Sequence, residues 1–108
     1  MPKGYEVERI AVKDESRLRT AVQKGARLIA LDERGRQLGT AQFASLLAAP
    51  AAFVIGGADG LSGATKNDAD LLLGLSTMTL PHALAQVILL EQIYRAATLL
   101  TGHPYHRD

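Results

Sequence analysis

The 108-residue sequence predicts a single α/β domain with a small parallel sheet flanked by helices. Two observations support this prediction. Short apolar runs alternate with segments of helical periodicity that carry their own cap residues, as in successive βαβ units. The length is close to that of common single domains, and no repeat, linker or low-complexity tract divides the chain. The fold class is therefore α/β, with four expected strands and four expected helices.

The first part of the chain contains two expected strands and one helix. Residues 5–12 alternate apolar and charged side chains, which is typical of an edge strand. Asp14 or Ser16 can cap a helix that ends at Gly25 in the C′ position. Residues 27–32 form a short apolar run, as expected of a strand that is buried on both faces.

The middle of the chain repeats this alternation. Thr40 can cap a helix that ends before Pro50, because proline cannot continue a helix. Residues 51–55 then predict a second buried strand. After a glycine-rich loop, Ser62 can begin a helix that continues to about Leu71.

The last part predicts a strand over 73–79 and a long helix over 82–101, with Gly102 in the C′ position. This helix is apolar on most of its faces, and a chain of this size cannot surround it. We therefore expect it to form a homodimer interface. Glu91 and Arg95 lie inside the apolar stretch, and charges at bilayer depth are costly, so a membrane span is not expected.

Composition excludes some classes of site. The chain has no Cys, which excludes disulfides, thiolate nucleophiles and zinc–thiolate sites and fits a cytoplasmic protein. The N-terminus has no apolar core of a signal peptide. The formal net charge is +1, so bulk charge gives no strong nucleic-acid signal, although most Lys and Arg residues lie in the first half. A solvated surface explains that asymmetry equally well.

Three segments could carry chemistry. The first, Gly56-Gly57-Ala58-Asp59-Gly60, follows a strand and would let backbone approach a ligand closely, although a tight βα turn explains it equally well. It matches neither the dinucleotide fingerprint nor a P-loop. The second, Leu75–Pro81, could read a purine edge through its backbone. Taken alone, it is better explained as a strand end before a helix that starts with proline.

The third segment is the tail His103-Pro104-Tyr105-His106-Arg107-Asp108. Histidine is the usual general base near neutral pH, and arginine is a usual phosphate contact. A metal site is the rival interpretation, but the two histidines lack helical spacing, so no metal is expected. A plain surface tail is the remaining alternative. His82, at the start of the last helix, is better explained as structural.

Taken together and in this order, these segments resemble the ribosomal RNA large subunit methyltransferase H family. The motifs are Ile55–Ser62, Leu75–Leu84, Glu91–Ala96 and His103–Asp108, and the likeness runs from about Tyr5 to the end. The family consists of SPOUT-class enzymes that methylate N3 of a pseudouridine in 23S ribosomal RNA. The resemblance implies a single SPOUT domain over 1–108, a homodimer, and a C-terminal trefoil knot with the cofactor region over about 51–108.

The resemblance also implies a site for S-adenosyl-L-methionine. The positions that match the family's cofactor residues are Leu31, Gly57, Ser76, Thr77, Met78, Thr79, Leu80 and Pro81. For catalysis it indicates the tail. His106 is the candidate base for the N3 proton, Tyr105 the candidate orienting group, and Arg107 the candidate contact to phosphate or target. The implied partner is ribosomal RNA or the ribosome.

One departure leaves alternatives open. Members of the family usually begin with a further strand, helix and loop, and this chain starts near their second strand. A natural short form, a truncation and an engineered minimal knot would all fit. A non-catalytic knotted dimer, with or without cofactor binding, is therefore an alternative function, and a SPOUT enzyme for a different RNA is another. A generic nucleotide-binding domain is a weaker alternative, because the sequence has no phosphate-binding loop at the expected position.

Overall fold

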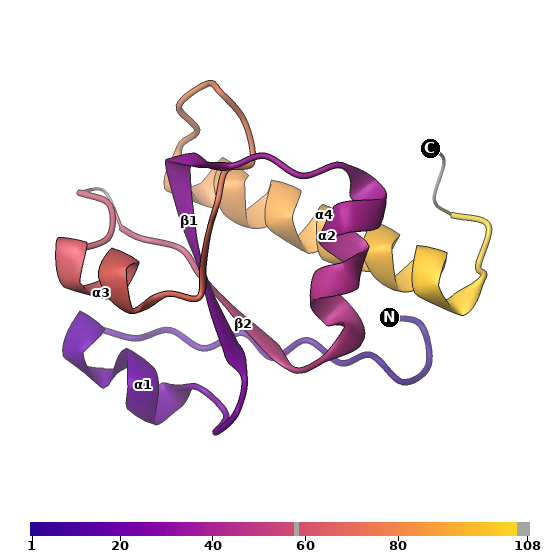
Figure 1. Cartoon of the computed structure of the whole chain (residues 1–108), viewed down its shortest axis with the longest axis horizontal. Helices are drawn as coiled ribbons and strands as arrows, with labels where there is room; N and C mark the ends of the chain where they lie inside the picture. Colours follow the sequence, from indigo (N-terminus) through magenta and orange to yellow (C-terminus); the bar gives the residue numbers. More distant parts are fainter. Residues whose placement is uncertain (58, 106–108) are drawn as a thin grey trace.

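Strand β1 (Arg27–Arg36) lies in the centre of a parallel sheet, between β2 (Ala51–Val54) and β3 (Leu71–Leu73). Figure 1 shows β1 and β2 with the helices around them. The structure is a computed structural model, and it describes residues 1–57 and 59–105. The order β2-β1-β3 requires two crossover connections, and each contains a helix. The α/β class and the parallel sheet flanked by helices are confirmed.

The central strand is buried on both faces, as the apolar run predicted. Leu28, Ile29 and Ala30 are each at most 1% exposed. Ile29 faces a core formed with β3, α2 (Thr40–Ser45), the 3₁₀ turn η2 (Leu46–Ala48) and α4 (His82–Thr101). Side chains alternate along a strand, so Leu28 and Ala30 face the opposite side of the sheet. Burial on both faces explains why this segment has no polar side chain between Leu28 and Leu31.

The helix ends follow the signals in the sequence. Ser62 caps α3 (Gly63–Asp68), and its hydroxyl accepts a hydrogen bond from the Thr65 amide at 3.2 Å. Gly102 ends α4 in the left-handed region at φ +75°, where glycine has no Cβ penalty. The bounds of α4 agree with those predicted.

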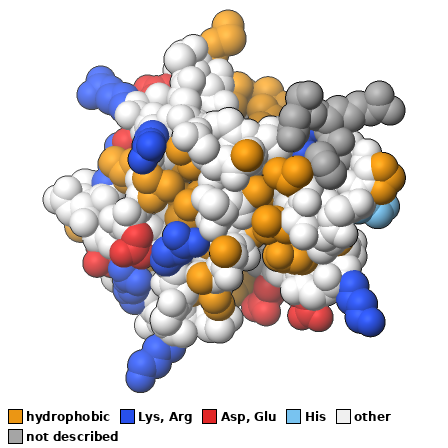
Figure 2. Space-filling view, turned by 45° about the vertical axis from the view of Figure 1, so that its right-hand side comes forward, with side chains coloured by type: hydrophobic (Ala, Val, Ile, Leu, Met, Phe, Trp, Pro, Cys, Tyr) orange, Lys and Arg blue, Asp and Glu red, His pale blue; other side chains and the backbone are white. Residues whose placement is uncertain are grey.

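Helix α4 packs against α2 and contributes Leu89, Ile93 and Ala96 to the core. By length and composition alone, α4 is also long and apolar enough to cross a membrane. A third of the residues in its most apolar window are buried inside the fold. The same helix exposes Leu84, Val87 and Leu90, whose exposed fractions are 46%, 62% and 38%. Figure 2 shows one face of the molecule, on which hydrophobic side chains reach the surface between charged ones.

The predicted first strand is wrong. Residues 5–12 form neither strand nor helix, and Val7 and Ile10 are 44% and 51% exposed. A strand needs a neighbour for its backbone N–H and C=O groups, and within the described residues the sheet offers 5–12 no such pairing. The following helix is also shorter than predicted, with a 3₁₀ turn η1 (Glu15–Arg17) and one turn of α1 (Leu18–Ala21).

The boundary between α3 and β3 also differs from the prediction. The helix stops at Asp68 instead of about Leu71, and β3 covers Leu71–Leu73 instead of 73–79. The amide of Asp70 donates to the Leu28 carbonyl at 2.7 Å. Pairing with β1 therefore begins where the helical pattern of the sequence would have continued. The tertiary contact overrides the local preference for helix.

Candidate functional site

The glycine loop and the start of α4 meet beyond the carboxyl end of β2. The loop follows Val54, and its Gly57 and Gly60 form an isolated bridge. His82 Nδ1 donates a hydrogen bond to the Gly56 carbonyl at 2.5 Å. Carbonyl oxygens only accept, so this contact assigns the proton to Nδ1. This contact links the loop to the start of α4, which is consistent with the structural role expected for His82.

The turn over 76–81 also contacts the second half of β1. Thr79 Oγ1 donates to the Glu33 carboxylate at 2.6 Å, and Leu31 pairs with Leu73, the last residue of β3. Parallel strands end at the same edge of a sheet. The three segments predicted to hold a cofactor, around Leu31, Gly57 and 76–81, therefore lie at one edge.

Two glycines let the backbone cross closely at this edge. A Cβ at Gly35 would lie 2.6 Å from the Leu73 carbonyl carbon, and a Cβ at Gly74 would lie 2.7 Å from the Gly35 carbonyl oxygen. Any side chain at either position would force the two strands apart. By contrast, a Cβ at Gly57 would meet no atom within 4 Å. The chain is thus tightly crossed beside β3 and open beside Gly57.

The turn before α4 presents neutral groups. The Ser76 hydroxyl accepts the Met78 amide at 2.9 Å, which closes a small hydroxyl-stabilised turn. Thr77, Met78 and Thr79 are exposed, and Met78 is 73% exposed. Backbone amides, hydroxyls and apolar side chains of this kind fit a neutral ring such as adenine better than a polyphosphate.

One charged pair stands close to this edge. Lys66 Nζ lies 3.4 Å from Asp32 Oδ2. The Arg34 amide donates to the Asp32 carboxylate and, together with Lys66, holds the pKa of Asp32 below its usual value. Lys66 is therefore committed to Asp32, which agrees with the conclusion that this loop is no P-loop. Among residues 1–57 and 59–105, His, Asp and Glu side chains form no group of three that could hold a metal ion.

The tail turns back onto α4. The Tyr105 hydroxyl donates to Glu91 Oε2 at 3.0 Å, and the ring lies edge-on to Tyr94 with centroids 4.6 Å apart. Arg95 Nη2 lies 2.7 Å from the same Glu91 oxygen, and its guanidinium carbon is 5.4 Å from the centre of the Tyr105 ring. The Glu91 carboxylate raises the pKa of Tyr105 above its usual value.

Tyr105 therefore keeps its proton at neutral pH, which suits an orienting group and opposes a role as base. The other two predicted catalytic residues, His106 and Arg107, lie outside the described residues.

Sequence reasoning missed one residue at this site, Glu33, and the long-range contacts of two others. Glu33 accepts the hydrogen bond from Thr79, and nothing in its local sequence marks it. Gly56 belongs to the glycine loop that the sequence singled out, but its contact with His82 spans 26 residues and has no local signal. Glu91 pairs with Arg95 at the i,i+4 spacing of a helix surface. Its second partner, Tyr105, is fourteen residues away, beyond what helical spacing can predict.

Comparisons with known proteins identify the family of this chain. The family model described as "Predicted SPOUT methyltransferase" matches residues 2–106. Proteins named ribosomal RNA large subunit methyltransferase H from Burkholderia ambifaria (strain MC40-6) and Burkholderia vietnamiensis (strain G4 / LMG 22486) are each 47% identical to this chain over 110 residues. The one from Nitrosospira multiformis is 44% identical over 110 residues. Each match covers 96% of this chain and 70% of the relative.

Proposed function

We propose that this chain, which belongs to the SPOUT methyltransferase family, transfers a methyl group from S-adenosyl-L-methionine to N3 of a pseudouridine in 23S ribosomal RNA. The observation that carries the proposal is the match to rRNA methyltransferases over almost the whole chain. It is supported by the convergence of the glycine loop and the turn over 76–81 at one edge of the sheet. A substrate in ribosomes places the protein in the cytoplasm.

The proposed cofactor site consists of Leu31, Gly57 and the turn over 76–81. The turn offers backbone donors and acceptors together with hydroxyls, and Leu31, Met78 and Leu80 offer apolar surface. The open space at Gly57 leaves room for a ligand against the backbone. Contacts from Glu33 to Thr79 and from His82 to Gly56 hold the two sides of the site in place. This combination fits a nucleoside with a neutral base.

When bound, S-adenosyl-L-methionine supplies an electrophilic methyl group on a sulfonium. The chain must hold the target uracil ring in line with that methyl group and give the N3 proton a route away. We assign proton removal to His106, orientation of the tail to Tyr105, and contact with phosphate or target to Arg107. The Glu91 hydrogen bond fixes the phenol of Tyr105, and residues 106 and 107 follow it directly in the chain.

The active form in this proposal is a homodimer with a C-terminal trefoil knot. Leu84, Val87 and Leu90 are three residues apart along α4 and form one exposed apolar stripe, which a second copy would cover. The close crossing of Gly35 and Gly74 is consistent with a backbone that passes tightly over itself before α4. In this dimer, we propose that the end of the chain beyond Tyr105 reaches the cofactor site of the partner.

The proposal can be tested on one purified sample. We expect calorimetric titration with S-adenosyl-L-methionine to show binding by a species of twice the chain mass. Transfer of labelled methyl to 23S rRNA in large ribosomal subunits should then be detectable. His106→Ala should abolish transfer and leave cofactor binding intact, whereas His103→Ala, a matched loss of an imidazole in the same tail, should retain most of the transfer.

Unchanged turnover of His106→Ala would remove His106 from the mechanism. A folded dimer that binds no S-adenosyl-L-methionine would contradict the enzyme and support the non-catalytic knotted module. Transfer to another RNA, with none to 23S rRNA, would contradict only the substrate.

A further inference from the structure

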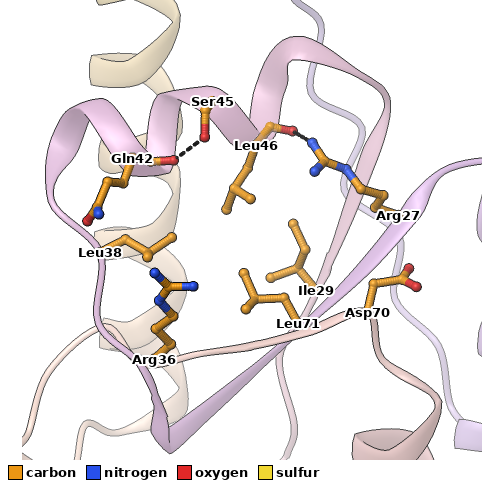
Figure 3. A pocket seen from close by; sticks show the side chains of 9 residues that line it. All are labelled: Arg27, Ile29, Arg36, Leu38, Gln42, Ser45, Leu46, Asp70 and Leu71. Carbon is orange, nitrogen blue, oxygen red and sulfur yellow. Dashed lines mark hydrogen bonds between the residues drawn. The ribbon is translucent and has the colours of Figure 1, made fainter.

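A cavity of about 380 Å³ lies on the α2 side of the sheet, between the strands β1 and β3 and the segment α2–η2 (Figure 3). This volume is in the range of small-ligand sites. None of the residues assigned above to the cofactor or to catalysis lines it. Its walls are formed by nine residues, Arg27, Ile29, Arg36, Leu38, Gln42, Ser45, Leu46, Asp70 and Leu71.

The floor of the cavity is apolar. Ile29, Leu38, Leu46 and Leu71 point toward its middle in Figure 3. Ile29 and Leu46 are buried in the core, at 1% and 9% exposed, so this floor belongs to the rigid part of the fold. A flat ring or a sugar could lie against it without disturbing the strands.

Two guanidinium groups flank this floor on opposite sides (Figure 3). Arg27 is held in place, because one terminal nitrogen donates to the Leu46 carbonyl at 2.6 Å. Its Nε is buried and, among residues 1–57 and 59–105, has no hydrogen-bond partner. Buried donors rarely stay unpaired, so this N–H requires an acceptor that the described part of the chain does not supply.

Arg36 stands at the other side, and its side chain is exposed. Within the described residues, its guanidinium makes no hydrogen bond or ion pair. The cavity does contain one carboxylate, that of Asp70, but Asp70 Oδ2 accepts the Leu28 amide at 2.7 Å and is committed to the backbone. Within the described residues, the cavity therefore has an unpaired guanidinium on one side, that of Arg36, and an unpaired N–H donor on the other, Arg27 Nε.

We propose that this cavity is a subsite for a nucleotide of the RNA substrate other than the methylated one. The phosphate lies against Arg36, the ring and sugar lie on the aliphatic floor, and a neutral oxygen of the base or ribose accepts the Arg27 Nε proton. This inference rests on the proposed function, which supplies RNA as the partner.

The location supports this occupant. Arg36 pairs with Leu73 at the end of β3, and the chain leaves β3 directly for the turn over 76–81. A strand of RNA that passes Arg36 would thus run toward the edge where the methyl donor is proposed to bind. Arg34, two residues earlier, carries the same charge but does not line the cavity.

The test compares two substitutions that remove the same charge. Binding of Arg36→Gln and Arg34→Gln to large ribosomal subunits would be measured by co-sedimentation at several salt concentrations. We expect Arg36→Gln to weaken binding on the order of tenfold, the effect of losing one charge-assisted contact. The slope of log affinity against log salt should also become shallower by about one. The expected loss for Arg34→Gln is at most a few-fold.

A second variant keeps both arginines. Gln42 Oε1 accepts the Gly39 amide at 3.1 Å at the start of α2, and Gln42→Glu keeps this acceptor and the shape of the side chain. It adds a negative charge to the wall of the cavity, so RNA binding should weaken while the melting temperature stays unchanged. Ser45→Glu would repeat the test from the next turn of α2.

Equal losses in Arg36→Gln and Arg34→Gln, or unchanged binding by Gln42→Glu, would overturn the subsite. Methyl transfer by the parent chain separates this failure from that of the proposed function. If the parent chain methylates and the two variants bind large ribosomal subunits equally well, only the subsite is refuted. A parent that binds ribosomal RNA without methylating it refutes only the function, and one that does not bind it refutes both.

Discussion

The first 26 residues and helix α4 are held to the rest of the fold in opposite ways. The N-terminal segment contributes no side chain to the buried core, and its anchors are polar. Glu15 accepts hydrogen bonds from Ser62 and Thr65, and Arg19 pairs with Asp68 at 2.7 Å. Helix α4, in contrast, is held by apolar side chains, with Ala96 fully buried.

The difference shows what burial adds to a chain of this size. Exposed ion pairs such as Arg19–Asp68 contribute little, because both side chains are more than half exposed and water screens them. Each buried aliphatic side chain of α4 removes apolar surface from water. We therefore expect α4, α2 and the sheet to unfold as one unit and the N-terminal segment to open before them.

The largest expected effect comes from the core side of α4. Leu89→Ala should lower the free energy of unfolding by about 2–5 kcal/mol, because Leu89 is 4% exposed and the truncation leaves a cavity. Leu100→Ala, on the same helix at 43% exposed, serves as the control and should cost about 1 kcal/mol or less. Urea denaturation measures both. Equal losses would mean that α4 is not anchored through its core face.

A smaller effect is expected where the backbone crosses itself. Gly35→Ala would place a methyl group 2.6 Å from the Leu73 backbone and should cost about 1–3 kcal/mol. Gly63→Ala is the matched control, since a methyl group there meets no atom within 4 Å and alanine favours the helix. It should leave the thermal midpoint unchanged or raise it. If Gly35→Ala leaves the stability unchanged, the two backbone segments lie farther apart than they do in the structure.

The smallest effect is expected for the polar anchor of the N-terminal segment. Hydrogen bonds from Thr65 and Ser62 lower the pKa of Glu15 below its ordinary value of 4.5. A lowered pKa means that this carboxylate stabilises the fold above pH 4.5 and that the stabilisation is lost as the pH falls through the lowered value.

Glu15→Gln should therefore reduce the thermal midpoint slightly at neutral pH, and the difference from the parent should shrink in acid. Glu8→Gln, in the preceding exposed segment, is the control and should leave the thermal midpoint at neutral pH unchanged. A constant difference from neutral pH to below pH 4 would contradict the role assigned to the charge of Glu15.

Much of the fold is fixed by signals that act over a few residues. The apolar run of β1, the Ser62 cap and the span of α4 with Gly102 in the left-handed region all appear where the sequence predicted them. Each depends on the conformational preference of one residue or on the side-chain pattern of a single element. The motifs that indicate the SPOUT family are likewise short stretches of consecutive residues.

The tertiary structure decided what depends on a distant neighbour. Residues 5–12 have the pattern of a strand, yet no strand pairs with them in the described part of the chain. β3 begins at Leu71 because β1 pairs with it there. The contacts of His82 with Gly56, Thr79 with Glu33 and Tyr105 with Glu91, and the cavity between Arg27 and Arg36, join residues far apart in the chain. Patterns along the sequence carry conformational preferences but not distances in space, so only the fold could bring these groups together.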